Sequence, residues 1–242
     1  MKHARIAWAG AIHEAVESDG ELLLTRSPWA GKRLKFDEVV WLPPLAPVAQ
    51  ARTILALGLN YADHAKELAF KAPEEPLVFV KGEASLIGHK ALTRRPQGVT
   101  HMHYECELAV VMGRTAKHVK KENALDYVGG YTVANDYAIR DYLENWYRPN
   151  LRVKNRDTCT PIGPWLVDAA DIPNPMSLKL QTTVKPLEMG RRVVVAVDSG
   201  VELSKVVEGR PLKFVREFAP GIGIWEAADP VAAAAVDRAP FQ

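Results

Sequence analysis

Residues 103–113 read HYECELAVVMG, a short polar segment that leads into an apolar run ending at a glycine. Within this stretch, residues 107–112 are rich in strand-forming types, and residues 131–134 have the same character. Segments 121–128 and 138–147 instead have the spacing of short helices. The mixture predicts an α+β fold that is mainly β.

The composition limits the class of protein. Of the 242 residues, 48% are hydrophobic and 25% are charged, as in soluble globular proteins. Lys and Arg number 31 against 29 Asp and Glu, and a net charge of +2 is too balanced for a nucleic-acid-binding surface. No apolar stretch approaches the ~20 residues that span a bilayer, and the N-terminal run is too short for a secretory signal. We expect a cytoplasmic protein with neither a nucleic-acid nor a membrane partner.

The chain divides into three parts. Residues 1–49 alternate short apolar runs with turn residues, among them the pair Asp19-Gly20, which favours a hairpin. A proline-rich link at 43–47 ends this small β leader. Residues 50–184 then form the main domain, and residues 185–242 form an atypical C-terminal segment.

The polar end of the opening stretch carries two carboxylates, Glu105 and Glu107. Side chains two apart in a strand share a face, so these carboxylates would lie side by side and repel each other. A hard divalent cation such as Mg²⁺ relieves that repulsion, and the alternative is the solvent-facing side of an edge strand. Asp136 follows the second strand, where it is either a third ligand or the N-cap of the helix expected from residue 138.

Two further groups suit catalysis. His64 and Glu67 lie three apart on the short helix expected at 61–70, and a carboxylate beside an imidazole raises its basicity, as a general base requires. A surface pair is the alternative. Lys154 lies in the charged segment 152–157, where it is either a solvated charge or a cation that faces a developing oxyanion.

Five motifs occur in order within residues 50–184: GLNYADHAKEL, PLVFVKG, HYECELAVVMG, GGYTVANDYAIRDYLENWYRPNLRVKNRD and TPIGPWLV. Together they resemble the fumarylacetoacetate hydrolase family. Within that family, NYADHAKELAF, KAPEEPLVF and NDYAIRDYLENWYRPNLRVK are most similar to the decarboxylase/isomerase branch of homoprotocatechuate (4-hydroxyphenylacetate) degradation.

The resemblance implies a fumarylacetoacetate-hydrolase-like mixed β-roll with short helices. It implies a Mg²⁺ or Mn²⁺ site formed by Glu105, Glu107 and Asp136. It further implies that His64 and Glu67 occupy the position of the base on a lid helix, and that Lys154 lies beside the metal.

The resemblance also places candidate substrate ligands in the family-like segments. Tyr61, Lys81 and Arg140 are expected to bind the substrate, and Lys81, Arg140 and Arg148 are candidates for its remote carboxylates. Family members are usually dimers, so we expect a homodimer.

The implied reaction is divalent-metal-dependent decarboxylation and isomerisation of an unsaturated 2-oxo di- or tricarboxylic acid in 4-hydroxyphenylacetate catabolism. Loss of carbon dioxide or proton transfer next to the carbonyl leaves a metal-bound enolate, which the metal and Lys154 stabilise. Hydrolysis of a carbon–carbon bond in an acylpyruvate or fumarylacetoacetate-type substrate is the enzymatic alternative. An inactive metal-binding remnant is the non-enzymatic one.

The similarity ends after residue 184. Residues 185–242 lack the Thr-Gly-Thr-Pro loop with which family members close the pocket, and they contain no Thr, Asn, Tyr, His or Cys. This composition favours a shifted reading frame of a GC-rich gene, and a divergent C-terminal subdomain is the alternative. The runs 193–197 and 201–207 have enough β-propensity to pair loosely with the sheet edge. We therefore expect a poorly packed segment and weak activity.

Overall fold

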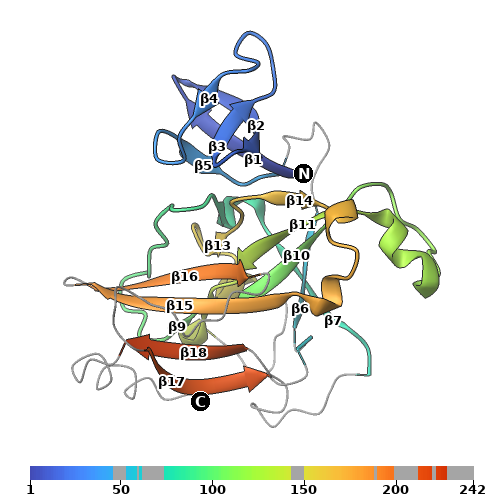
Figure 1. Cartoon of the computed structure of the whole chain (residues 1–242). Coiled ribbons are helices and arrows are strands. Elements are labelled where there is room, and N and C mark those ends of the chain that lie inside the picture. Colours follow the sequence, from blue (N-terminus) through green and yellow to red (C-terminus); the bar gives the residue numbers. More distant parts are fainter. Residues whose placement is uncertain are drawn as a thin grey trace.

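Strands dominate the computed structural model, as the sequence predicts (Figure 1). The structure describes residues 1–45, 53–58, 60–61, 74–142, 150–187, 190–198, 212–219 and 222–227. Within these ranges, the helices are short, and the α-helix α2 (Leu151–Lys154) spans a single turn. The fold is therefore α+β and mainly β. In the same ranges, no helix combines the length and the apolar character needed to cross a bilayer.

The N-terminal strands form antiparallel hairpins. They are β1 (Lys2–Trp8), β2 (Ala11–Ser18), β3 (Glu21–Leu24), β4 (Arg33–Leu34) and β5 (Val40–Leu42). Asp19 and Gly20 both have positive φ, which confirms the predicted hairpin turn between β2 and β3. The inward positions of these strands form one core of buried side chains: Ala4, Ile6, Ala15, Leu22, Leu24, Leu34 and Trp41.

The leader strands continue into the main sheet. The order β10-β11-β14-β1-β2-β3-β4 is formed because β1 pairs with β14 (Leu166–Asp168), which also pairs with β11. β10 (Cys106–Met112) and β11 (Val128–Asn135) confirm the two strongest strand predictions. β10, which begins at Cys106 at the end of the polar segment, thus lies on the same sheet as the leader.

Aromatic side chains pack where leader and main sheet meet. Trp41 contacts Trp165 edge-on, with ring centroids 5.1 Å apart, and both rings also pack edge-on against Phe36. A Cβ atom at Gly88 would lie 2.0 Å from the Trp41 carbonyl oxygen. Only glycine fits at this close approach of two backbones.

Three strand pairs lie outside the main sheet. β6 (Ile54–Gly58) pairs with β7 (Leu77–Lys81), β8 (Leu86–Ile87) with β13 (Thr160–Pro161), and β9 (Met102–His103) with β12 (Ala138–Ile139). The helix expected at 138–147 is wrong at its start, because Ala138 and Ile139 form β12 and are fully buried. Tertiary packing overrides the helical spacing here. The helix expected at 121–128 is the 3₁₀ helix η2 (Lys121–Tyr127).

The C-terminal part forms a second sheet in the order β16-β15-β18-β17. The strands are β15 (Lys179–Leu187), β16 (Gly190–Asp198), β17 (Leu212–Ala219) and β18 (Ile222–Ala227). β15 and β16 contact β10 and β11, so the two sheets lie against each other (Figure 1). The predicted pairing of residues 193–197 occurs in β16, whereas the run 201–207 lies outside the described residues. Loose packing of the segment 185–242 stays a prediction.

Candidate functional site

Three carboxylates meet where β10 begins and β11 ends. In the antiparallel register Cys106 faces Asn135, so Glu105 and Asp136 lie at the same end of the strand pair. The N–H of Asp136 donates to the carbonyl of Glu105 (2.9 Å), and the N–H of Glu105 donates to Oδ1 of Asn135 (2.9 Å). One carboxylate oxygen from each of Glu105, Glu107 and Asp136 lies within 4.8 Å of the others. The backbone therefore fixes the three acidic residues as one cluster.

Two buried lysines reach this cluster from other elements. Lys154, in α2, donates to Oε2 of Glu105 (2.6 Å) and to Oδ2 of Asp136 (2.8 Å). Lys81, the last residue of β7, forms a short ion pair with Oδ1 of Asp136. Both carboxylate oxygens of Asp136 are thus held by ammonium groups. The N-cap interpretation of Asp136 is wrong, because no helix begins at residue 138.

Arg140 joins the cluster from the 3₁₀ helix η3 (Arg140–Tyr142). Its Nη2 donates to Oε1 of Glu105 at 2.9 Å, and its Nε–H donates to Nδ1 of His103 at 3.2 Å. The side chain of Arg140 is 24% exposed, whereas that of Lys81 is 3% exposed. Of the two predicted substrate cations that the structure describes, Arg140 is therefore the more accessible one.

The electrostatics of the cluster are unbalanced at Glu107. Burial, together with the negative charges of Asp136 and Glu105, raises the pKa of Glu107 to about 8, although Lys154 and Lys81 oppose the shift. Burial alone would lower the pKa of Lys154, but the carboxylates of Glu105 and Asp136 raise it overall. Lys154 therefore stays an ammonium group at neutral pH.

This donor set fits a hard divalent cation. Carboxylate oxygens are the ligands that Mg²⁺ and Mn²⁺ prefer, and three of them converge here. Burial, more than the charges of Asp136 and Glu105, raises the pKa of Glu107. A cation bound among the three carboxylates would favour the charged form of Glu107.

The thiol between the two glutamates does not suit nucleophilic chemistry. Burial raises the pKa of Cys106 to about 12, and its Sγ–H donates to the carbonyl of Gln181 at 3.7 Å. Since the thiolate is the reactive form, Cys106 is inert at neutral pH.

The residues predicted to carry the base, His64 and Glu67, lie outside the described ranges. His64, Glu67 and Arg148 fall in the segments 62–73 and 143–149, of which the structure gives no description. Tyr61, just before the first of them, accepts the N–H of Leu108 on its phenol oxygen at 3.3 Å. Burial raises the pKa of Tyr61, so the phenol stays protonated. Tyr61 is thus tied to the residue that follows Glu107.

Two supporting residues carry no sequence signal that singles them out. Asp141 accepts hydrogen bonds from the N–H and hydroxyl of Thr100 and from the N–H of His101, which fixes the turn next to Arg140. Asn155 accepts the N–H of Gly82 and donates to the carbonyl of Val80. Both are polar residues in charged segments, where solvation is the ordinary expectation.

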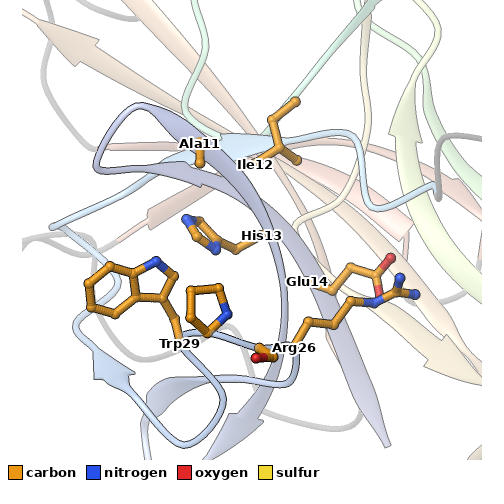
Figure 2. A pocket seen from close by; sticks show the side chains of 8 residues that line it. Ala11, Ile12, His13, Glu14, Arg26 and Trp29 are labelled. Atoms are coloured by element: carbon orange, nitrogen blue, oxygen red, sulfur yellow. The ribbon is translucent and has the colours of Figure 1, made fainter.

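A hollow lies on the leader strands, away from the carboxylate cluster (Figure 2). Its lining includes Trp29, which packs edge-on against Trp8 with ring centroids 5.5 Å apart, and Arg26, which pairs with Glu14 at 2.7 Å. The Arg26 charge is already neutralised by Glu14, and the lining contains none of the three clustered carboxylates. This hollow therefore does not suit a metal-chelating acid.

Residues 53–205 match the family model described as fumarylacetoacetate (FAA) hydrolase C-terminal. The chain is 58% identical over 138 residues to the 4-hydroxyphenylacetate degradation bifunctional isomerase/decarboxylase of Salmonella dublin, a match covering 57% of this chain and 32% of that protein. It is 40% identical over 176 residues to an uncharacterized protein of Archaeoglobus fulgidus, covering 72% and 66% of the two chains. The chain thus matches only about a third of the length of its isomerase/decarboxylase relatives.

Solved structures give the same likeness. The structure of 5-carboxymethyl-2-hydroxymuconate delta-isomerase from Mycobacterium smegmatis has a TM-score of 0.62 at 31% identity, covering 80% of this chain and 75% of that one. The 2-hydroxyhepta-2,4-diene-1,7-dioate isomerase from Mycobacterium marinum has a TM-score of 0.61 at 29% identity, covering 76% and 71%.

Proposed function

Because this chain belongs to the fumarylacetoacetate hydrolase family, we propose that it is a divalent-metal-dependent enzyme that decarboxylates and isomerises an unsaturated 2-oxo di- or tricarboxylic acid of 4-hydroxyphenylacetate (homoprotocatechuate) catabolism. Relatives with 58% identity are named as bifunctional isomerase/decarboxylases of that catabolism. Since the identity extends over only part of their length, the chemistry has to be argued from the residues of this chain.

One observation carries the proposal: three carboxylates and a buried ammonium group converge at one point. Glu105, Glu107 and Asp136 would hold Mg²⁺ or Mn²⁺. When bound there, such a cation supplies positive charge to the carboxylate and keto oxygens of a chelating 2-oxo acid. The roles of the protein side chains follow from their charges and contacts.

Lys154 suits the stabilisation of negative charge. Loss of carbon dioxide, or removal of a proton, next to a 2-oxo group moves negative charge onto that oxygen. Lys154 keeps its proton and is 6% exposed, and its three N–H groups donate to Oε2 of Glu105 and to Oδ2 and the main-chain carbonyl of Asp136, so its positive charge is fixed in place before substrate arrives. A preorganised charge of this kind lowers the barrier more than a mobile surface lysine does.

The proton shift of the isomerisation needs a base as well. His64 and Glu67 are three residues apart in sequence, a spacing that suits an imidazole hydrogen-bonded to a carboxylate. The hydrogen bond from the Leu108 N–H to the Tyr61 phenol oxygen supports this assignment. It links a residue three positions before His64 to the residue that directly follows Glu107. In this proposal, His64 removes the proton from one carbon and returns it to another.

Turnover of the full chain tests the proposal. Purified protein with Mg²⁺ or Mn²⁺ would be given unsaturated 2-oxo dicarboxylates and tricarboxylates, and carbon dioxide release and product NMR would be recorded. We expect carbon dioxide from a substrate whose second carboxylate is conjugated with the ketone, and a proton shift in the resulting dienoate. Cleavage of an acylpyruvate into two acids without carbon dioxide would instead support the hydrolase alternative. Metal binding without any turnover would support an inactive remnant.

A further inference from the structure

Lys81 is a charged residue on the buried face of a strand. In β7 the side chains alternate, with Val78 and Val80 exposed and Phe79 and Lys81 buried. Lys81 is 4% exposed, and burial of an ammonium group is unfavourable unless specific acceptors surround it.

The acceptors of Lys81 come from two other parts of the fold. Its Nζ donates to Oδ1 of Asp136, which follows β11, and to the main-chain carbonyl of Lys154 in α2, at 2.6 Å for the latter. Asp136 and Lys154 also contact each other, since Nζ of Lys154 donates to Oδ2 of Asp136. One ammonium group thus joins the end of β7, the end of β11 and α2.

The backbone on both sides of Lys81 is fixed as well. The Asn155 side-chain amide accepts the N–H of Gly82 at 2.5 Å and donates to the carbonyl of Val80 at 3.1 Å. Asn155 directly follows Lys154, so the same short segment that carries Lys154 also sets the position from which Lys81 extends. A lysine anchored at its backbone and at its ammonium group has little freedom to turn toward a ligand.

We propose that Lys81 is a positioning residue, which orients the Asp136 carboxylate within the cluster and holds the main chain of Lys154 beside it. In this proposal Lys81 does not bind the remote carboxylate of the substrate. The inference rests on the proposed function insofar as Asp136 is a metal ligand. The contact of Lys81 with Oδ1 and that of Lys154 with Oδ2 together fix the orientation of the Asp136 carboxylate, and the contact of Lys81 with the Lys154 carbonyl fixes the main chain from which the Lys154 side chain extends.

The test separates a positioning role from substrate binding and from simple charge balance. Lys81→Met removes the ammonium group at similar length, and Lys117→Met, on an exposed lysine, is the matched control. Mn²⁺ affinity of the substrate-free protein is measured by electron paramagnetic resonance. We expect Lys81→Met to weaken Mn²⁺ binding roughly 10- to 100-fold, as loss of a partner of a metal ligand does. Unchanged or tighter binding would overturn the proposal.

Kinetics give a second readout. For a positioning residue, Lys81→Met lowers kcat by the same factor for a 2-oxo acid with a remote carboxylate and for a short one without it. A rise in KM confined to the substrate with the remote carboxylate would overturn the proposal and return Lys81 to substrate binding.

A milder variant keeps the proposal testable if Lys81→Met fails to fold. Asn155→Ala leaves every charge in place but frees the backbone on either side of Lys81, and we expect Mn²⁺ affinity to change in the same direction by a smaller factor. Independently of any metal, urea unfolding of the EDTA-treated Lys81→Met, Asp136→Asn and double variants should be non-additive. If the changes in unfolding free energy are non-additive but the wild type binds no metal, the proposed function is overturned and the interaction between Lys81 and Asp136 stands. Additive changes would overturn the interaction between Lys81 and Asp136 itself.

Discussion

The ammonium group of Lys154 lies 2.6 Å from Oε2 of Glu105, although 49 positions separate the two residues in the sequence. The contact is made because α2 lies against β7, β12 and η3, next to the point where β10 begins, and Lys154 is buried there. Positive charge is therefore fixed beside the carboxylates before any substrate enters.

The first prediction concerns this ammonium group. Lys154→Met should lower kcat by roughly 10²- to 10³-fold, the loss measured when one preorganised donor to a developing oxyanion is removed. The rate of product formation at saturating substrate is the measurement, with Lys117→Met as the surface control. Full activity in Lys154→Met would mean that the ion pair of Lys154 with Glu105 serves the fold and not the reaction.

The second prediction concerns the metal. Glu107→Gln should abolish the rise in melting temperature that Mg²⁺ gives the wild type, because a cation held by three carboxylates loses much of its affinity with one of them. Glu122→Gln, on an exposed residue of η2, is the matched control and should keep the wild-type shift. An unchanged shift in Glu107→Gln would exclude Glu107 as a ligand.

The sequence predicts the strands of the site better than its contacts. Alternation in a strand places Glu105 and Glu107 on one face, and the run at 131–134 places Asp136 at a strand end. Both follow from local spacing, which the structure keeps in β10 and β11. The sequence predicts the ends of helices and strands less accurately, since residues 138–139 have helical spacing but form a strand that pairs with β9.

The supporting network could not be predicted, because its partners are far apart in sequence. Lys81 and Asp136 are separated by 55 positions, and Asn155 and Val80 by 75. No periodicity connects such pairs; the packing of α2 against β7 brings Asn155 to Val80, and tertiary packing likewise brings the end of β7 to the end of β11. The family-like motif therefore predicts that Lys81 binds substrate, and the burial of Lys81 in the structure argues against that role.

The third prediction concerns the base. His64→Asn should lower turnover by roughly 10²- to 10⁴-fold, the range for loss of a general acid/base, while Mg²⁺ still raises the melting temperature. The control is His118→Asn, because His118 is exposed and Asn tolerates its positive φ. A variant of His64 with wild-type kcat would make His64 and Glu67 a surface pair.

The fourth prediction is a pH dependence of stability. The N–H of Thr100 holds the pKa of Asp141 below its usual range, although desolvation opposes the shift, and further hydrogen bonds from the Thr100 hydroxyl and the His101 N–H lower it too. A carboxyl whose pKa is lower in the folded state stabilises the fold above its unfolded pKa of about 3.9, and this stabilisation is lost as pH falls through the folded pKa. Asp141→Asn should thus unfold at lower urea than the wild type at pH 7.

The difference in urea midpoint between Asp141→Asn and the wild type should become smaller as pH falls below about 4, because the wild-type carboxyl also becomes neutral as pH falls through its folded pKa. Urea midpoints at several pH values measure it. Asp126→Asn, an exposed residue of η2, should show no such gap. A gap for Asp141→Asn that is constant from pH 7 to pH 3 would mean that its charge does not contribute.

The last prediction concerns substrate polarity. Arg140 is paired with Glu105 and His103, yet its side chain is 24% exposed, so it remains reachable by a ligand, whereas Lys81 is enclosed. A hydrogen bond to a charged group contributes about 1.5–3 kcal/mol, so Arg140→Met should raise KM roughly 10- to 100-fold for a 2-oxo acid with a remote carboxylate. KM for a short 2-oxo acid without that group should change less. If Arg140→Met instead lowers kcat equally for both acids, its role is to hold Glu105, and the remote carboxylate is bound by another residue.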